Sequence, residues 1–378
     1  MQIISISEEK KMYNTAQDVQ ELAENIKKSA ETLKGIDLSE NSFSPEALLP
    51  VLAELGKVEG LEIVVFRGIF TQRVKEQVYP SLRDIVKYIS PLKKVSYFDI
   101  SDNALSMNGM EILVPLIESM HALKHLVMNN NGIGIDGGEF LAKALEKLSA
   151  QSTALESLEV GRNRLEDSAT KLGKALAMFP YFDVLKIYQN SISSINIGDL
   201  LSSLENQSMR VLDISDNFLL EHGSTVLSGV VASWPIEYLN ISDCMMSDKG
   251  IEVFARSIPS SVALQGELVS EKEIDMSYND ITEGAIEHIR AVLQKMHSTR
   301  LVLTGNELAK EAVESLCKDA EETTCEIHFE EEEDDDLVFS SEEKEESADT
   351  QNDQVIKKIE EQIAELAIQR DENGLHSE

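Results

Sequence analysis

The stretch LKHLVMNNNGI, residues 123–133, carries apolar side chains at its first, fourth and sixth positions and an asparagine at its ninth. This spacing matches the leucine-rich pattern L-x-x-L-x-L-x-x-N/C-x-L, in which a short strand and a helix make one repeat. The pattern recurs in LKGIDLSENSF (33–43), LEIVVFRGIFT (61–71), VSYFDISDNAL (95–105), LESLEVGRNRL (155–165), FDVLKIYQNSI (182–192), MRVLDISDNFL (209–219), IEYLNISDCMM (236–246), EKEIDMSYNDI (271–281) and STRLVLTGNEL (298–308). The sequence therefore predicts ten repeats.

The distance between successive ninth positions gives the length of each repeat. These positions are Asn41, Ile69, Asn103, Asn131, Asn163, Asn190, Asn217, Cys244, Asn279 and Asn306. Most of them lie 27 or 28 residues apart, with longer intervals after repeats two, four and eight. A repeat of this length has room for a full helix, and segments 45–55, 110–120 and 138–148 show apolar residues at helical spacing. We predict an α/β leucine-rich-repeat solenoid, a crescent with a parallel inner sheet and outer helices.

The segments outside the repeats differ from them in composition. Residues 1–32 include most of a helical pattern at 17–33, and we expect them to cap one end of a crescent that spans 33–325. Residues 326–378 hold 20 acidic and 4 basic side chains, and the run EEEEDDD occupies 330–336. Such a segment repels itself and has few apolar residues, so a disordered acidic tail is predicted there. Within it, residues 355–370 have the spacing of a short amphipathic helix.

Charge and composition exclude several classes of partner. The formal net charge of -34 argues against nucleic acid or an anionic membrane and favours a protein with a basic surface. No apolar run resembles a signal peptide or a membrane span, so we expect a soluble protein of the cytoplasm. Three cysteines without a C-x-x-C pair fit free thiols in a reducing compartment.

Motifs for self-contained catalysis are missing from the sequence. No phosphate-binding loop, zinc-protease helix or nucleophile elbow occurs. His121 and His125 lie four residues apart, and a solvated pair is preferred over a metal site because no third ligand is nearby. The residues alone therefore indicate a leucine-rich-repeat binding module without a metal or cofactor.

Position eight of each repeat comes at the end of the strand, directly before the asparagine at position nine. We expect the position-nine asparagines, Asn131 among them, to turn inward and bond to the backbone. Position eight should instead face outward, on one rim of the crescent. Its occupants are Glu40, Gly68, Asp102, Asn130, Arg162, Gln189, Asp216, Asp243, Tyr278 and Gly305, with Arg164 beside them at position ten.

A cluster of cations marks one part of this rim. FRGIFTQRVK (66–75) carries Arg67, Arg73 and Lys75, and the long interval after repeat two is expected to bring Arg73 near Asp102 and Asn130. A solvated loop would explain three such charges if they stood alone. Arg162 and Arg164 could pair with Glu159 and Glu166, although an exposed pair contributes only ~0–1 kcal/mol to stability. Mixed charge on this rim suggests a docking face.

Several of these segments strongly resemble the Ran GTPase-activating proteins. They are IFTQRVKEQVYPSLRDIV (69–86), SDNAL (101–105), NNNGIG (129–134), GRNRLED (161–167), SDNFL (215–219) and SWPIEYLNISDC (233–244). The similarity runs from about residue 30 to about residue 320, and the acidic tail also matches. F-T-x-R-V-K followed by a proline, and G-R-N-R-L-E, are much more specific than the repeat consensus.

The resemblance implies an activator of GTP hydrolysis on the small GTPase Ran, a regulator of nucleocytoplasmic transport, with no active site of its own. The family's loop arginine falls on Arg73. Its rim asparagine, which acts on the GTPase's own active-site residues, falls on Asn130. The family is thought to work without an arginine finger, and the GTPase holds the GTP and magnesium. Together with the rim positions, the resemblance gives as partner-binding candidates Lys75, Asp102, Arg162, Arg164, Gln189, Asp216 and Asp243.

The sequence also departs from the family pattern. Gln72 stands where a glycine is expected, and Arg67-Gly68 replaces an expected Ser-Asp. The chain looks like the shorter, yeast-like form, without the folded C-terminal domain of animal members. We expect a monomer, and a Ran-binding protein joining a ternary complex stays an open option. The alternative function is a non-catalytic scaffold or inhibitor that covers its target.

Overall fold

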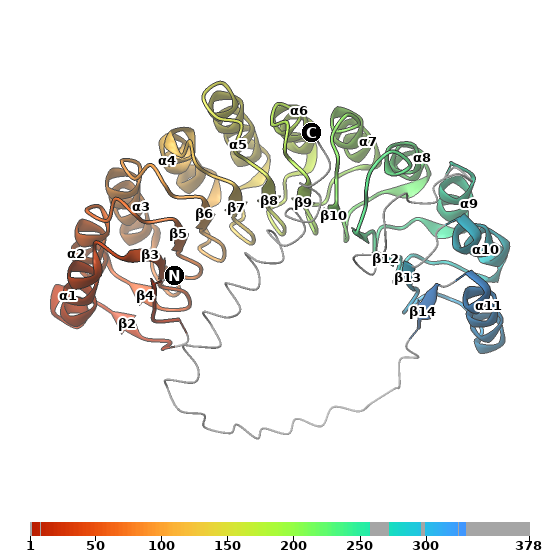
Figure 1. Ribbon diagram of the computed structural model, residues 1–378, viewed down its shortest axis with the longest axis horizontal. Coiled ribbons are helices and arrows are strands. Elements are labelled where there is room, and N and C mark those ends of the chain that lie inside the picture. Colours follow the sequence, from red (N-terminus) through yellow and green to blue (C-terminus); the bar gives the residue numbers. More distant parts are fainter. Residues whose placement is uncertain (1, 8, 258–271, 296–298, 324, 330–378) are drawn as a thin grey trace, which may run out of the picture.

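Alternating short strands and helices wind the chain into a crescent, with strands along the inner edge and helices outside (Figure 1). The computed structural model describes residues 2–7, 9–257, 272–295, 299–323 and 325–329. The acidic run at 330–336 and the predicted helix at 355–370 lie outside the described residues. The predicted leucine-rich-repeat fold is confirmed.

The inner layer is one sheet of twelve parallel strands, and neighbouring repeats supply neighbouring strands. Its strands are β1 (Gln2–Ser5), β3 (Leu33–Asp37), β5 (Ile63–Val65), β6 (Tyr97–Asp99), β7 (His125–Val127), β8 (Ser157–Glu159), β9 (Val184–Lys186), β10 (Val211–Asp213), β11 (Tyr238–Asn240), β12 (Lys272–Asp275), β13 (Thr299–Val302) and β14 (Glu326–His328). A second, small sheet pairs β2 (Met12–Tyr13) with β4 (Ser42–Phe43).

The outer layer consists of helices that follow each strand and pack on their neighbours. The α-helices are α1 (Gln20–Ser29), α2 (Pro45–Leu55), α3 (Lys75–Ile89), α4 (Ser106–Ser119), α5 (Gly134–Ser149), α6 (Ala169–Leu176), α7 (Ser194–Ser203), α8 (Leu220–Val231), α9 (Ser247–Ser257), α10 (Ile286–Lys295) and α11 (Lys310–Thr323). Short 3-10 turns are η1 (Ala16–Val19), η2 (Glu166–Ser168) and η3 (Glu283–Ala285). The helices predicted at 45–55, 110–120 and 138–148 are confirmed within α2, α4 and α5.

Both ends of the sheet extend past the predicted repeats. At the N-terminal end, β1 pairs with β3, and the predicted helix at 17–33 stops at Ser29 because Leu33 starts β3. At the other end, β14 pairs with β13, so the sheet reaches into the segment assigned to the tail. An end strand with free backbone groups readily accepts another strand, which explains both additions.

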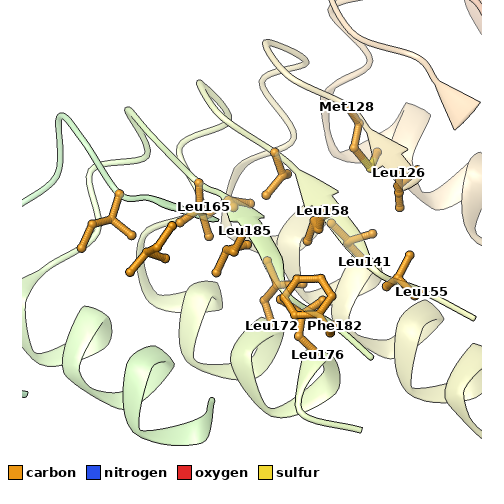
Figure 2. Packing of buried hydrophobic residues seen from close by; sticks show 14 of the residues in the cluster. Leu126, Met128, Leu141, Leu155, Leu158, Leu165, Leu172, Leu176, Phe182 and Leu185 are labelled. Carbon is orange, nitrogen blue, oxygen red and sulfur yellow. The ribbon is translucent and has the colours of Figure 1, made fainter. Parts of the chain in front are cut away.

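The core lies between the two layers. Leu126, Leu158 and Leu185 occupy position four of three successive repeats and pair in register across β7, β8 and β9. All three are fully buried, and Leu141 of α5 and Leu172 of α6 pack in the same cluster (Figure 2). Burying one leucine contributes about 1.5–3 kcal/mol, and the repeat multiplies that gain along the crescent.

The position-nine asparagines turn inward and bond to the backbone, as predicted, and their contacts form a series from strand to strand that is here called the ladder. Asn131 donates to the carbonyls of Ile100 (3.0 Å) and Met128 (3.2 Å), and its Oδ1 accepts from the backbone N–H of Asn103 (3.0 Å). Asn163 repeats the arrangement one strand further along and accepts from the N–H of Asn131 (3.0 Å). The ladder supplies partners to backbone groups where each strand ends, which would otherwise be buried without hydrogen bonds.

Positions three and five of each repeat point to the inner face of the sheet, and several of their side chains are buried there. Ile63, Val65, Tyr97 and Val127 are buried and form a separate apolar cluster with the partly buried Ile3. The curved sheet crowds side chains of adjacent strands on its inner side, and such cross-strand neighbours pack against each other.

The interpretation of His125 as a solvated side chain is wrong. Its ring is 9% exposed and lies 6.1 Å, between centroids, from the ring of Tyr97. Position three places it on the inner face of the sheet, where the neighbouring strands cover it.

Candidate functional site

The ten position-eight residues, here called the rim, share one backbone conformation. Each has φ between +50° and +69°, the left-handed region. A residue other than glycine pays roughly 1–2 kcal/mol for this conformation, so the surrounding structure must impose it. The ladder asparagine that follows each rim residue imposes the turn, except in repeats two and eight, where Ile69 and Cys244 stand at position nine. The same turn presents the side chains of the eight rim residues other than glycine to solvent.

Asn130 and Asp102 are neighbours on the rim, as predicted. Both are exposed, and the Asn130 amide donates to Asp102 Oδ1 at 2.8 Å. The backbone N–H of Asn130 donates to the carbonyl of Gly161 in the next repeat at 2.9 Å. The contact with Asp102 uses one amide hydrogen, and the carbonyl oxygen and second hydrogen of Asn130 have no partner among the described residues.

Arg162 and Arg164 extend from the next repeat into solvent. Among the residues that the structure describes, neither forms an ion pair or hydrogen bond through its side chain. The alternative pairing with Glu159 is not found, because Glu159 bonds to Lys186 at 3.0 Å instead. The repeat next to Asn130 thus presents two exposed guanidinium groups that have no ion pair within the part of the chain that the structure describes.

The Arg73 side chain turns toward the N-terminal end of the crescent rather than toward Asp102 and Asn130. Its Nε donates to Ser42 Oγ (2.9 Å) and its Nη2 to the carbonyls of Ser42 and Tyr13 (both 3.0 Å). Its Nη1 donates to Asn14 Oδ1 at 2.8 Å. These four bonds tie the loop after β5 to the small sheet of β2 and β4, because the planar guanidinium fits several acceptors at once.

The other two cations of FRGIFTQRVK have separate surroundings. Arg67 donates from Nε (3.1 Å) and Nη2 (2.9 Å) to Oδ2 of Asp99, whose side chain is buried on the inner face of the sheet. Burial raises the pKa of Asp99, and the Arg67 guanidinium opposes that rise by favouring the carboxylate. Lys75 is exposed at the start of α3 and makes no ion pair with any described residue. The three cations therefore do not form one cluster.

Gln72 adopts the backbone conformation that a glycine would adopt. Its φ is +63°, and its side chain is exposed. The loop thus keeps its left-handed turn even though glutamine replaces the expected glycine. The four hydrogen bonds of the adjacent Arg73 help to hold the chain in this conformation.

Repeats six to nine continue the rim with a different character. Gln189, Asp216 and Asp243 are exposed there, as predicted. Exposed apolar side chains lie among them, with Phe218 45% and Met245 47% exposed. Acidic and apolar groups on one rim suit a protein partner with basic and apolar side chains.

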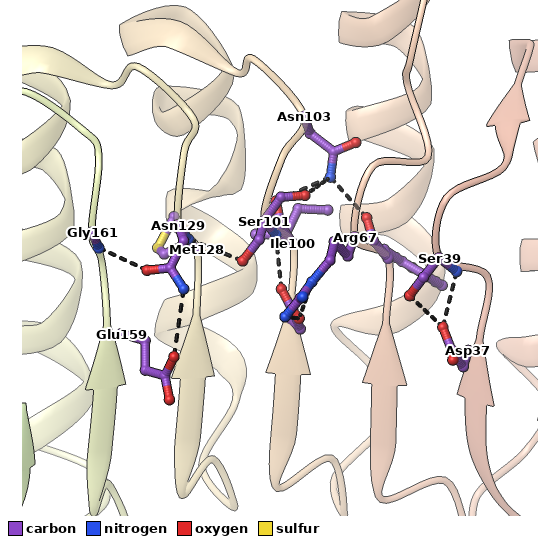
Figure 3. A network of polar contacts seen from close by, with 12 residues as sticks. Asp37, Ser39, Arg67, Ile100, Ser101, Asn103, Met128, Asn129, Glu159 and Gly161 are labelled. Carbon is purple, nitrogen blue, oxygen red and sulfur yellow. Dashed lines mark hydrogen bonds and ion pairs between the residues drawn. The ribbon is translucent and has the colours of Figure 1, made fainter. Parts of the chain in front are cut away.

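Two residues next to the rim were missed by sequence analysis. Asn129 Oδ1 accepts the backbone N–H of Gly161 at 2.7 Å, and the ring of Tyr188 lies over Gly161. Figure 3 shows the polar contacts running from Gly161 through Asn129 to Ser101. Ser101 in turn donates its N–H to Asp99 Oδ1 (2.8 Å), and Arg67, which follows β5, donates to the same carboxylate (2.9 Å). The signal for them was their place at position seven, where most other repeats carry serine.

The described residues include no group of three or more His, Cys, Asp or Glu arranged to hold a metal ion. No helix among them is long and apolar enough to cross a lipid bilayer. The rim is an open surface of amide, guanidinium and carboxylate groups. Such an arrangement can bind and orient groups on another macromolecule.

Comparison with known proteins finds a matching family model and several relatives, which differ in the share of the chain that they cover. The model of the Leucine Rich repeat family matches residues 235–255. Ran GTPase-activating protein 1 of Saccharomyces cerevisiae is 30% identical over 304 residues, which cover 76% of this chain and 72% of the yeast protein. The Ran GTPase-activating protein of Drosophila melanogaster is 30% identical over 53% of this chain and 35% of its own length.

Among solved structures, the leucine-rich repeat-containing protein LegL7 from Legionella pneumophila matches with a TM-score of 0.47 and 14% identity. The match covers 82% of this chain and 97% of LegL7.

Proposed function

Because this chain belongs to the Ran GTPase-activating protein family, we propose that it accelerates GTP hydrolysis by a Ran-type small GTPase. The GTPase would carry the nucleotide and its magnesium ion, and the rim would act on it from outside. The observation that carries this proposal is the rim itself, where Asn130 stands exposed between Asp102 and Arg162, whose guanidinium has no ion pair with any described residue.

Hydrolysis by a small GTPase requires a water molecule in line with the γ-phosphate, oriented by a glutamine of the GTPase. Asn130 supports a role in orienting that glutamine, because its carbonyl oxygen and one amide hydrogen are available among the described residues. The bond to Asp102 fixes the direction of the amide before the partner arrives. Ordering a mobile catalytic group in this way removes an entropic part of the barrier.

Arg73 acts in this proposal as an anchor rather than as an arginine finger. Its guanidinium makes four hydrogen bonds within the protein, so inserting it into the GTPase active site would break all of them. The loop that it fixes, from Gln72 to Lys75, is exposed and can contact a switch loop of the GTPase. Arg73 therefore contributes by holding this loop in its binding conformation.

The docking contacts come from both halves of the rim. Lys75, Arg162 and Arg164 would meet acidic or phosphate-bearing groups near the nucleotide, while Asp216 and Asp243 would meet basic side chains. We place the activity in nucleocytoplasmic transport, in the cytoplasm, with the protein acting as a monomer. A Ran-binding protein in a ternary complex is compatible with this arrangement. The acidic segment after residue 330 would raise the association rate by attraction to a basic partner.

The test is single-turnover GTP hydrolysis by Ran with catalytic amounts of this protein, comparing wild type, Arg73→Ala, Arg73→Lys and Asn130→Ala. We expect strong acceleration by wild type, near-complete loss with Arg73→Ala, and a lower rate at saturation with Asn130→Ala. Arg73→Lys keeps the charge but loses the several directed bonds, so it should resemble Arg73→Ala if anchoring is the role. Thermal unfolding of each variant distinguishes a local change in the loop from a loss of the folded structure as a whole. A complex with Ran but no acceleration by wild type would instead support the scaffold alternative.

A further inference from the structure

Position seven of the repeats shows two different patterns. In repeats one, three, seven, eight and nine a serine follows two residues after an aspartate or asparagine, as in Asp213–Ser215 and Asn240–Ser242. There the serine N–H donates to the side chain at position five of the same strand, and Ser215 donates both its N–H (3.1 Å) and its hydroxyl (2.7 Å) to Asp213 Oδ1. Repeats four, five and six lack this pair and carry Asn129, Gly161 and Tyr188 instead, and repeats two and ten carry Arg67 and Thr304.

These three residues make contacts between repeats rather than within one. Asn129 Oδ1 accepts the N–H of Gly161 from the next strand at 2.7 Å (Figure 3). The N–H of Asn129 in turn donates to Ser101 Oγ of the preceding repeat at 3.0 Å. Asn129 thus joins three successive strands at their ends, next to the rim.

Tyr188 covers the other end of this contact. A methyl group added at Gly161 would lie 2.3 Å from Cζ of Tyr188, so the ring rests directly on the glycine. Gly161 is required here because no larger residue fits beneath the ring. Tyr188 is half-buried, and the Arg162 guanidinium lies close enough to influence its pKa, which burial raises.

The same three residues hold the backbone of the proposed active rim. The N–H of Asp102 donates to the carbonyl of Asn129 (2.9 Å), that of Asn130 to Gly161 (2.9 Å), and that of Arg162 to Tyr188 (3.0 Å). The backbone N–H of each of these three rim residues is therefore bonded to the carbonyl at position seven of the following repeat. Fixing position seven fixes the relative placement of the Asn130 amide and the Arg162 guanidinium.

We propose that Asn129 and Tyr188 are positioning residues that hold Asn130 and Arg162 in the geometry required to stimulate the GTPase. This inference rests on the proposed function. In the five repeats with serine at position seven, the serine N–H donates to the side chain at position five of the same strand, and Ser101 in addition accepts the N–H of Asn129. The lateral contacts add rigidity between strands, and they occur in the repeats that carry Asn130, Arg162 and Arg164.

The experiment measures the saturating single-turnover rate and the Kd for GTP-bound Ran separately, with urea unfolding of each variant. Asn129→Ala and Tyr188→Ala should lower the saturating rate about ten-fold or more, while Kd changes less than about three-fold. The variants lose the fixed orientation of Asn130 and Arg162 and keep the contacts that dock the GTPase. Tyr188→Phe keeps the ring on Gly161 and should retain the rate. Asn129 Nδ2 lies 3.5 Å from Glu159 Oε2, so Asn129→Asp is combined with Glu159→Gln to keep two carboxylates from facing each other. This double variant keeps the acceptor oxygen at position 129 and should have most of the wild-type rate.

Ser215→Ala is the matched control, since it removes a position-seven side chain that bonds only to its own strand in the contacts described. It should leave both the rate and Kd unchanged. Unchanged saturating rates for Asn129→Ala and Tyr188→Ala would overturn the inference, as would an equal loss with Ser215→Ala.

Hydrogen–deuterium exchange keeps the inference testable if wild type fails to stimulate Ran, an outcome that would overturn the proposed function alone. The N–H groups of Asp102, Asn130 and Arg162 should exchange faster in Asn129→Ala and Tyr188→Ala than in wild type. Equal exchange rates in wild type and both variants would overturn the positioning role.

Discussion

Adjacent asparagines at 130 and 131 allow the clearest separation of stability from function. Asn131→Ala removes a buried amide that bonds to Asn103, Ile100 and Met128. The two carbonyls keep one partner each, because Ile100 still accepts from Asn103 Nδ2 (3.0 Å) and Met128 from Asn163 Nδ2 (2.9 Å). The N–H of Asn103, in contrast, loses its acceptor, the Asn131 side-chain oxygen, and stays buried.

These losses set the size of the expected effect. A buried N–H left without an acceptor costs about 1–3 kcal/mol, and the two weakened carbonyl contacts and a small cavity add about 1 kcal/mol. We therefore expect Asn131→Ala to lower the free energy of unfolding by about 2–4 kcal/mol. Asn130→Ala removes one exposed hydrogen bond, to Asp102, and should cost below about 1 kcal/mol.

Urea unfolding followed by far-ultraviolet circular dichroism measures both variants, and the dependence on urea concentration should keep its wild-type slope. In the hydrolysis assay the order reverses. Asn130→Ala should lose stimulated turnover, while folded Asn131→Ala should retain much of it. Equal losses of stability in the two variants, or a cost below about 1 kcal/mol for Asn131→Ala, would refute the ladder reasoning.

Three further predictions follow from single residues. Gln72→Gly should raise the free energy of unfolding by about 1 kcal/mol, because glycine adopts φ of +63° without strain; equal or lower stability in urea would contradict this. Cys244→Asn should stabilise by about 1 kcal/mol, since the cysteine offers only a sulfur contact to the Ile214 carbonyl (3.3 Å) where eight other repeats offer an asparagine amide, and a lower urea midpoint would argue against it. Asp213→Asn should raise stability at neutral pH and flatten its acid dependence. Burial raises the pKa of Asp213 in the folded state, so its protonated form contributes stability that is lost as pH rises through that pKa. Parallel stability–pH curves for wild type and Asp213→Asn would contradict that assignment.

The sequence predicted the repeats, the helices and the ladder because each depends on spacing within one repeat. Leu126 and its counterparts at position four face the core for the same reason in every repeat. Asn131 and the other position-nine asparagines have the same kinds of backbone group to bond. The contacts of Arg73 could not be predicted in this way. They depend on Ser42 and on the small sheet of β2 and β4, which brings Tyr13 and Asn14 beside a loop about 60 residues further along.

The sequence by itself determined that this chain forms a leucine-rich crescent and which side chains stand on its rim, since position within the repeat decides burial. The resemblance to a family then directed attention to Asn130 and Arg73. Only the tertiary structure decided that Arg73 bonds inward, that Arg162 and Arg164 lack ion pairs with described residues, and that Asn129 and Tyr188 link neighbouring strands. Those properties depend on the side chains that neighbouring repeats bring together, and the spacing of a single repeat carries no information about them.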